Sequence, residues 1–155
     1  MHSGKSSSSV TKMIDQSGYH HAGHCVYMAQ YHIVWCPKFR YGVLKNEKAS
    51  RLKEILKDVC DAYRYEIRAV EVMPDHIHLF VDVPQTVAPC DIARTLKSRS
   101  AVAMLHEFPD LRKFYARCGV LWSRGYFIST AGHISAETVK RYIEEQNARE
   151  KAHKN

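Results

Sequence analysis

The stretch MPDHIHLFVDV, residues 73–83, decides the fold, and it carries two histidines one residue apart within a largely apolar run. Pro74 and Asp75 are typical turn residues, because proline fixes φ and aspartate tolerates turn geometry. Residues 66–73 and 76–83 on either side are rich in strand-forming residues, and Pro84 stops the second run. We therefore predict a β-hairpin with its turn at Pro74-Asp75.

The second strand of this hairpin has two different faces, because successive side chains of a strand point to opposite sides. Ile77, Leu79, Val81 and Val83 share one face, and His76, His78 and Phe80 share the other. The apolar face suits a core. Two neutral imidazoles side by side can share one divalent ion, although the spacing alone fits equally well with two partly exposed histidines that make ordinary hydrogen bonds.

Working outward from the hairpin, the remaining elements follow from periodicity and turn residues. We predict a strand from Cys25 to Pro37, an amphipathic helix over 47–64, a helix over 90–108, a loop over 109–119, a strand around 126–130 and a helix from Ser135 to the C-terminus. The order predicts an α+β fold, a ferredoxin-like or RNA-recognition-like βαββαβ antiparallel sheet with helices, plus one C-terminal helix.

Length and composition indicate one domain. The chain has 155 residues and is 45% hydrophobic, enough for a single core, which we place in residues 24–155. Residues 1–23 are rich in Ser, Gly and His without periodicity, so we expect a disordered tail. Because we find neither a run of about 20 apolar residues nor a secretory signal, we expect a soluble cytoplasmic protein with no membrane partner.

Net charge indicates the kind of partner, and the cysteine spacing indicates the redox state of the thiols. The formal net charge of +7 and the isoelectric point near 9.2 favour a polyanionic partner through phosphate contacts. The five cysteines are widely spaced and form no CxxC pair, which indicates reduced thiols rather than a disulfide framework or a zinc ribbon.

The predicted C-terminal helix offers a second polar pair. Val139, Tyr142, Ile143 and Gln146 follow helical spacing, so a tyrosine hydroxyl and an amide oxygen project together one turn apart. The same pattern is typical of an amphipathic helix whose tyrosine packs in the core and whose glutamine borders it.

Four stretches, YHIVWCPKFRYGVL, MPDHIHLF, LWSRGYFISTAG and VKRYIEEQ, in this order and at these separations, closely resemble the small single-tyrosine HUH transposases of bacterial and archaeal insertion sequences (IS200-like transposases). The resemblance implies that His76 and His78 are metal ligands, that Tyr142 is the nucleophile and that Gln146 completes the metal site. The implied cofactor is a divalent ion, Mg²⁺ or Mn²⁺. Two imidazoles and an amide form a ligand set of low charge, unlike the carboxylate clusters of two-metal nucleases.

The resemblance also implies the reaction and its partners. Such enzymes cleave and rejoin single-stranded DNA near hairpins at the element ends through a 5′-phosphotyrosine, and they act as homodimers whose active site can be shared between subunits. On DNA, this protein would be associated with the nucleoid. The candidate DNA contacts are Lys38, Arg40, Arg94, Lys97, Arg99 and Arg124, which sequence does not separate from ordinary surface charge.

Three alternatives stay open. A domesticated tyrosine recombinase acting on palindromic repeats would use the same chemistry on another substrate. A non-catalytic nucleic-acid-binding module would use the sheet alone, with histidines that merely form hydrogen bonds. A replication-initiating HUH enzyme fits less well, because the chain is short and its histidines precede the tyrosine. The chain departs from the usual family pattern in its longer N-terminal segment and in having only residues 147–155 after Gln146.

Overall fold

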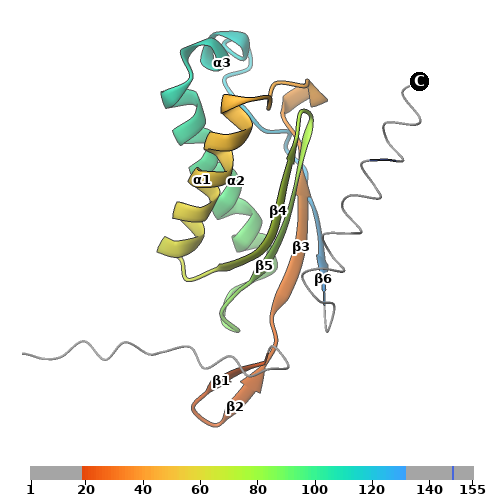
Figure 1. The fold of residues 1–155 in the computed structure, drawn as a ribbon, viewed down its shortest axis with the longest axis vertical. Helices are drawn as coiled ribbons and strands as arrows, with labels where there is room; N and C mark the ends of the chain where they lie inside the picture. Colours follow the sequence, from red (N-terminus) through yellow and green to blue (C-terminus); the bar gives the residue numbers. More distant parts are fainter. Residues whose placement is uncertain (1–18, 132–147, 149–155) are drawn as a thin grey trace, which may run out of the picture.

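Four strands form one antiparallel sheet in the computed structural model, which describes residues 19–131 and 148 (Figure 1). The strands are β3 (Gln30–Trp35), β4 (Glu66–Met73), β5 (His76–Asp82) and β6 (Phe127–Thr130), and their order in the sheet is β4-β5-β3-β6. Strand β5 therefore lies between β3 and β4, which is the strand arrangement of a βαββαβ ferredoxin-like fold. The predicted α+β class and antiparallel sheet are confirmed.

Two helices, α1 (Glu47–Ala62) and α2 (Pro89–Glu107), cover one face of this sheet (Figure 1). The core lies between these two layers. Its fully buried members include Ile33, Ile77, Leu79 and Val81 from the sheet and Leu52, Leu56, Ile92 and Leu96 from the helices. The predicted apolar face of the histidine strand thus packs in the core.

The β4–β5 hairpin has the predicted turn. Met73 pairs with His76, so Pro74 and Asp75 alone connect the strands. The pairing is irregular between Ile67 and Ala69, where a bulge places Arg68 out of register.

The segment after α2 differs from the prediction. Residues 109–119 were expected to be a loop, but Pro109–Phe114 form a short helix, α3. Proline is favoured at the first helical position, Asp110 suits the positive end of the helix dipole, and Leu111 is buried against the core. One buried leucine is too little periodicity to indicate a helix from sequence.

The N-terminal boundary is also corrected. Residues 20–22 were assigned to a disordered tail, yet β1 (His20–Ala22) pairs with β2 (Cys25–Tyr27) in a separate two-stranded sheet. The strand predicted from Cys25 onward is accordingly divided into β2 and β3. The Nε2 atom of His20 lies 2.7 Å from a carboxylate oxygen of Asp82, and no local pattern reveals this distant anchor.

Several predictions concern residues that the structure leaves undescribed. Residues 1–18 and most of the predicted C-terminal helix, including Tyr142 and Gln146, lie outside the described residues. Within residues 19–131, no helix is long and apolar enough to cross a membrane.

Candidate active site

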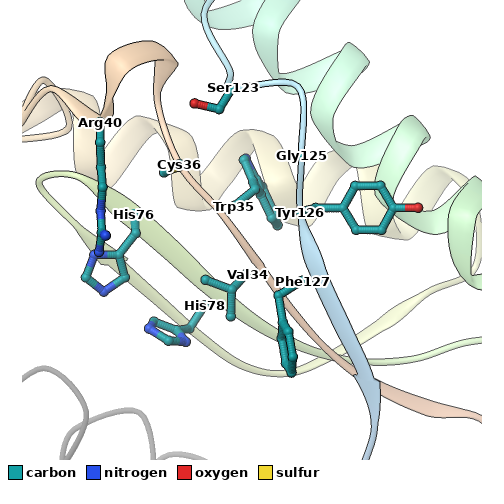
Figure 2. Close-up of a pocket in the computed structure, with 10 residues that line it drawn as sticks. All are labelled: Val34, Trp35, Cys36, Arg40, His76, His78, Ser123, Gly125, Tyr126 and Phe127. Atoms are coloured by element: carbon teal, nitrogen blue, oxygen red, sulfur yellow. The ribbon is translucent and has the colours of Figure 1, made fainter.

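Strand β5 places the two histidines of the HIH motif together on the sheet face opposite the helices (Figure 2). Their exposed fractions are only 4% for His76 and 2% for His78. Both histidines are therefore buried, which differs from the alternative of two partly exposed histidines considered from the sequence. The ring centroids lie 4.9 Å apart with the rings nearly perpendicular. Both imidazoles therefore lie close enough to act on one ligand.

The Nδ1 atom of each histidine contacts a neighbouring side chain. Nδ1 of His76 lies 2.7 Å from Oδ1 of Asp75, and Nδ1 of His78 lies 3.1 Å from Nε2 of His32 on β3. When Nδ1–H is the donor in both contacts, the lone pair of each ring resides on Nε2. Metal-binding histidines in proteins are oriented in this manner by partners of their other nitrogen.

The Nε2 atom of His78 is a candidate ligand atom. It is buried and has no hydrogen-bond partner among the described residues. A buried polar atom without a partner costs free energy unless water or a ligand satisfies it, and this atom borders a pocket that can hold either. The atom is therefore suited to coordinate a metal ion.

The environment favours the neutral form of His78 and of His32, because it lowers the pKa of both. Burial, followed by the neighbouring His76 and His32, lowers the pKa of His78 to about 4. Burial also lowers the pKa of His32. Histidine must be neutral to ligate a metal, so His78 is ready to do so at neutral pH without first losing a proton.

The histidines border a pocket of about 320 Å³ (Figure 2). It is lined by Val34, Trp35, Cys36, Arg40, His76, His78, Ser123, Gly125, Tyr126 and Phe127. Arg40 brings a permanent positive charge to this pocket, and its Nε lies 3.6 Å from Oδ2 of Asp75. A guanidinium beside two potential metal ligands is an arrangement suited to a phosphate group.

The two described histidines fit a metal site but do not complete one. Within residues 19–131, no group of three or more His, Cys, Asp or Glu side chains is placed to hold a metal ion. The predicted third ligand, Gln146, contributes an amide oxygen and lies outside the described residues.

Three of the six predicted DNA-contacting cations lie at or beside the pocket. Arg40 lines it directly, Lys38 belongs to the same short helical turn, η1 (Lys38–Arg40), and Arg124 is an exposed residue between the lining residues Ser123 and Gly125. These positions are compatible with phosphate contacts near the histidines.

The other three cations lie on α2, the helix that covers the opposite face of the sheet. Arg94 is exposed and pairs with Asp91 at 3.2 Å, and Arg99 donates to the hydroxyl of Tyr63 at 2.8 Å. Lys97 instead donates from Nζ to the backbone carbonyls of residues 123–125, at 2.7, 3.1 and 3.0 Å. Lys97 therefore holds the loop that forms one wall of the pocket.

Sequence reasoning missed two partners of the histidine pair. Asp75 was assigned only a turn role, but its carboxylate also orients His76. His32 was not singled out, although its alternation with the buried Ile33 in β3 is a signal that it faces the side away from the core.

Comparison with known proteins identifies the family. Residues 25–146 match the family of transposases described as IS200-like. The chain is 39% identical over 127 residues to the ISDra2 transposase TnpA of Deinococcus radiodurans, covering 81% of this chain and 89% of that protein. It is 32% identical over 123 residues to the transposase for insertion sequence element IS200 of Salmonella typhimurium, covering 79% of this chain and 80% of that protein.

A solved structure agrees with the sequence relatives. A crystal structure assigned as a transposase from Deinococcus radiodurans R1 superposes with a TM-score of 0.68 at 34% sequence identity, covering 81% of this chain and 96% of that one. The family match spans both the histidine strand and the predicted tyrosine position. The chain therefore belongs to the IS200-like transposase family.

Proposed function

We propose that this protein cleaves and rejoins single-stranded DNA at the ends of an insertion sequence, with Tyr142 as the nucleophile. In this proposal a divalent ion, Mg²⁺ or Mn²⁺, is held by His76, His78 and Gln146. The observation that carries it is the buried histidine pair, in which both Nδ1 atoms have partners and Nε2 of His78 has none among the described residues. Membership of the transposase family supports the same conclusion.

The covalent step requires no external energy source. The Oη atom of Tyr142 attacks the phosphorus and releases its proton to solvent water, while the bond from phosphorus to the 3′ oxygen breaks. The departing 3′ oxygen takes up a proton and becomes a hydroxyl, and the 5′ phosphate remains on the enzyme as a phosphotyrosine. Because the phosphodiester energy is retained, attack by another 3′-OH on this intermediate rejoins the strand.

The chain's own residues supply position and charge. His76 and His78 would hold the ion, which when bound polarises the phosphate and neutralises the developing negative charge. Asp75 and His32 fix the two rings, so the ligand atoms need no reorganisation. Arg40, at the pocket edge, is positioned to contact a phosphate oxygen directly.

The proposed partners are single-stranded DNA with hairpin ends and a second copy of the chain. We propose that the segment carrying Tyr142 completes the histidine site of the partner subunit or of its own. The support for these partners is the family resemblance together with the basic net charge of +7.

A covalent-adduct assay tests the chemistry. The protein is mixed with a labelled single-stranded oligonucleotide carrying a hairpin from the end of its own element, with Mg²⁺, Mn²⁺ or chelator. We expect a denaturation-resistant protein–DNA adduct that requires metal and disappears in Tyr142→Phe, while binding persists. Tyr63→Phe, which alters an exposed tyrosine of the helical layer, is the matched control and should form the adduct normally. Binding with no adduct under any metal would favour the non-catalytic binding module instead.

Mixing two inactive variants tests the shared site. Tyr142→Phe is combined with a His76→Ala/His78→Ala double variant under conditions that allow subunit exchange. If the tyrosine acts in the partner's site, a mixed dimer retains one complete site and adduct formation returns. If it acts within its own subunit, every site stays incomplete and no adduct appears.

A further inference from the structure

Three aromatic side chains form a connected exposed group beside the pocket, and we refer to Phe39, Tyr41 and Phe114 as the aromatic surface. Their exposed fractions are 63%, 49% and 56%. The ring centroids of Phe39 and Tyr41 lie 5.8 Å apart, and those of Tyr41 and Phe114 lie 5.3 Å apart. Contiguous exposed aromatic rings mark binding surfaces more often than scattered single residues do.

The backbone that presents Phe39 is strained. Phe39 and the next residue, Arg40, have φ angles of 62° and 54°, a left-handed conformation that is unfavourable for residues other than glycine. Neighbouring contacts hold the turn in place. The amide of Lys38 donates to the carbonyl of Leu121 at 2.7 Å, and the carbonyl of Lys38 accepts from the hydroxyl of Tyr115 at 3.0 Å. Strain that is fixed in this way is concentrated at functional sites.

The two segments that carry the aromatic surface contain only basic charges, although Asp75 of the β4–β5 turn pairs with Arg40 at 3.6 Å. Residues 37–45 and 112–117, which contain the three rings, include six basic residues and no acidic residue: Lys38, Arg40, Lys45, Arg112, Lys113 and Arg117. Nζ of Lys38 lies 5.3 Å from the centroid of Phe39. Rings interleaved with cations fit a ligand that is both flat and anionic, and unpaired nucleic acid has both properties.

The aromatic surface is continuous with the histidine pocket. Arg40 separates Phe39 from Tyr41 in the chain and lines the pocket together with His76 and His78. The amide of Leu44 donates to the carbonyl of Pro74 at 3.0 Å, which ties this loop to the β4–β5 turn. Figure 1 shows the loop after β3, the β4–β5 turn and α3 at the same end of the molecule.

We propose that the aromatic surface stacks against unpaired bases of the DNA strand whose phosphate enters the histidine pocket. Arg40 contacts the DNA backbone between these stacked bases and that phosphate. The inference rests on the proposed function for the identity of the strand. It adds a base-binding subsite that would position the strand, formed by the loop after β3 and by α3.

Equilibrium binding tests the stacking. The probe is a fluorescein-labelled 20-nucleotide oligothymidylate, measured by anisotropy in chelator with Tyr142→Phe as the parent, so that no cleavage occurs. Loss of one stacking ring weakens binding about five-fold or more, so we expect a Phe39→Ala/Phe114→Ala variant to bind at least about 25-fold more weakly. Phe39→Tyr/Phe114→Tyr should retain binding. Tyr63→Ala, which removes an exposed ring of the helical layer, should change little.

Salt dependence separates stacking from charge. Removing rings should leave the slope of log K against log salt unchanged, whereas Arg40→Gln should reduce its magnitude by about 0.7, the value for one phosphate contact on a single strand. Unfolding curves of all variants verify that the fold is retained. A folded Phe39→Ala/Phe114→Ala variant with the parent's affinity would overturn the proposal.

Two further outcomes are distinguishable. If the double variant keeps DNA affinity but loses self-association in sedimentation, the surface is a contact between copies of the chain and the stacking proposal is wrong. If ring-dependent DNA binding is found but wild type forms no covalent adduct, the stacking proposal stands and the proposed chemistry fails.

Discussion

Nδ1 of His78 lies 3.1 Å from Nε2 of His32, and the two rings stack with centroids 5.4 Å apart and planes 12° from parallel. Val34 is the residue directly opposite His78 in the β3–β5 pairing, so His32 reaches it diagonally across the pair. The contact fixes which nitrogen of His78 is directed away from β3. His32 is therefore a positioning residue for the proposed metal site.

Replacing His32 tests this role. We expect His32→Ala to weaken Mn²⁺ binding by about 10- to 100-fold, the usual effect of losing a partner of a metal-ligating histidine. His32→Gln, whose amide oxygen can accept from Nδ1–H, should retain more affinity than His32→Ala. Titration calorimetry measures both, with unfolding curves as a check on the fold. Wild-type Mn²⁺ affinity in folded His32→Ala would show that the contact does not orient His78.

Stability should depend on pH through His78. Its pKa is about 4 in the folded protein against 6.5 for an ordinary histidine, so the unfolded chain binds the proton more tightly. The difference of about 2.5 units corresponds to about 3 kcal/mol, which is fully present above pH 6.5 and is lost as the pH falls toward 4. The lowered pKa of His32 acts in the same direction.

Urea unfolding at several pH values in chelator measures this effect. We expect the free energy of unfolding to fall between pH 6.5 and 4 in wild type, and to fall less steeply in His78→Phe, which has no proton to gain at that position. Equal slopes in the two proteins would contradict a neutral buried His78.

Local sequence patterns predicted most of the fold. The hairpin at Pro74-Asp75 and the helices α1 and α2 depend on turn residues and on periodicity within one segment, and the structure has them within a few residues of the predicted bounds. Strand β1 and helix α3 could not be predicted in this way. β1 has only three residues and is anchored to Asp82, 62 positions from His20, while α3 is defined by one buried leucine.

The site was predictable to the same extent. Alternation in β5 correctly placed His76 and His78 on one face, but the contact with His32 depends on the register of β3 against β5, which the sequence does not specify. Lys97 resembled any other surface cation, because its carbonyl partners are 26 to 28 positions away. The roles of Tyr142 and Gln146 stay predictions, since both lie outside the described residues.

The buried carboxylate of Asp82 should be essential for the N-terminal hairpin. It is 1% exposed and contacts Nε2 of His20 at 2.7 Å and a guanidinium nitrogen of Arg68 at 3.0 Å. Asp82→Asn removes the charge from both contacts, but the Arg68 side chain is 25% exposed and keeps Glu66 at 3.6 Å. We therefore expect about 1–3 kcal/mol of lost stability. Faster hydrogen exchange in β1 and β2 should accompany the loss of stability.

Asp61→Asn is the control for that experiment. Its carboxylate is 62% exposed and pairs with Lys57 at 2.8 Å, and exposed pairs of this kind contribute little. We expect wild-type unfolding and wild-type exchange in the hairpin. Similar behaviour of the two variants would show that the Asp82 contacts do not hold β1 in place.

Lys97 should stabilise the pocket wall rather than bind DNA. Its Nζ donates to three backbone carbonyls in residues 123–125, and burial lowers its pKa. Lys97→Ala leaves those carbonyls without their charged donor, so we expect about 2 kcal/mol of lost stability and weaker adduct formation. The slope of log K for oligothymidylate against log salt should not change. Arg94→Ala, which removes an exposed cation three residues earlier on α2, should leave unfolding unchanged. A reduced salt slope with wild-type stability in Lys97→Ala would instead make Lys97 a phosphate contact, because only a cation that displaces counterions from DNA alters that slope.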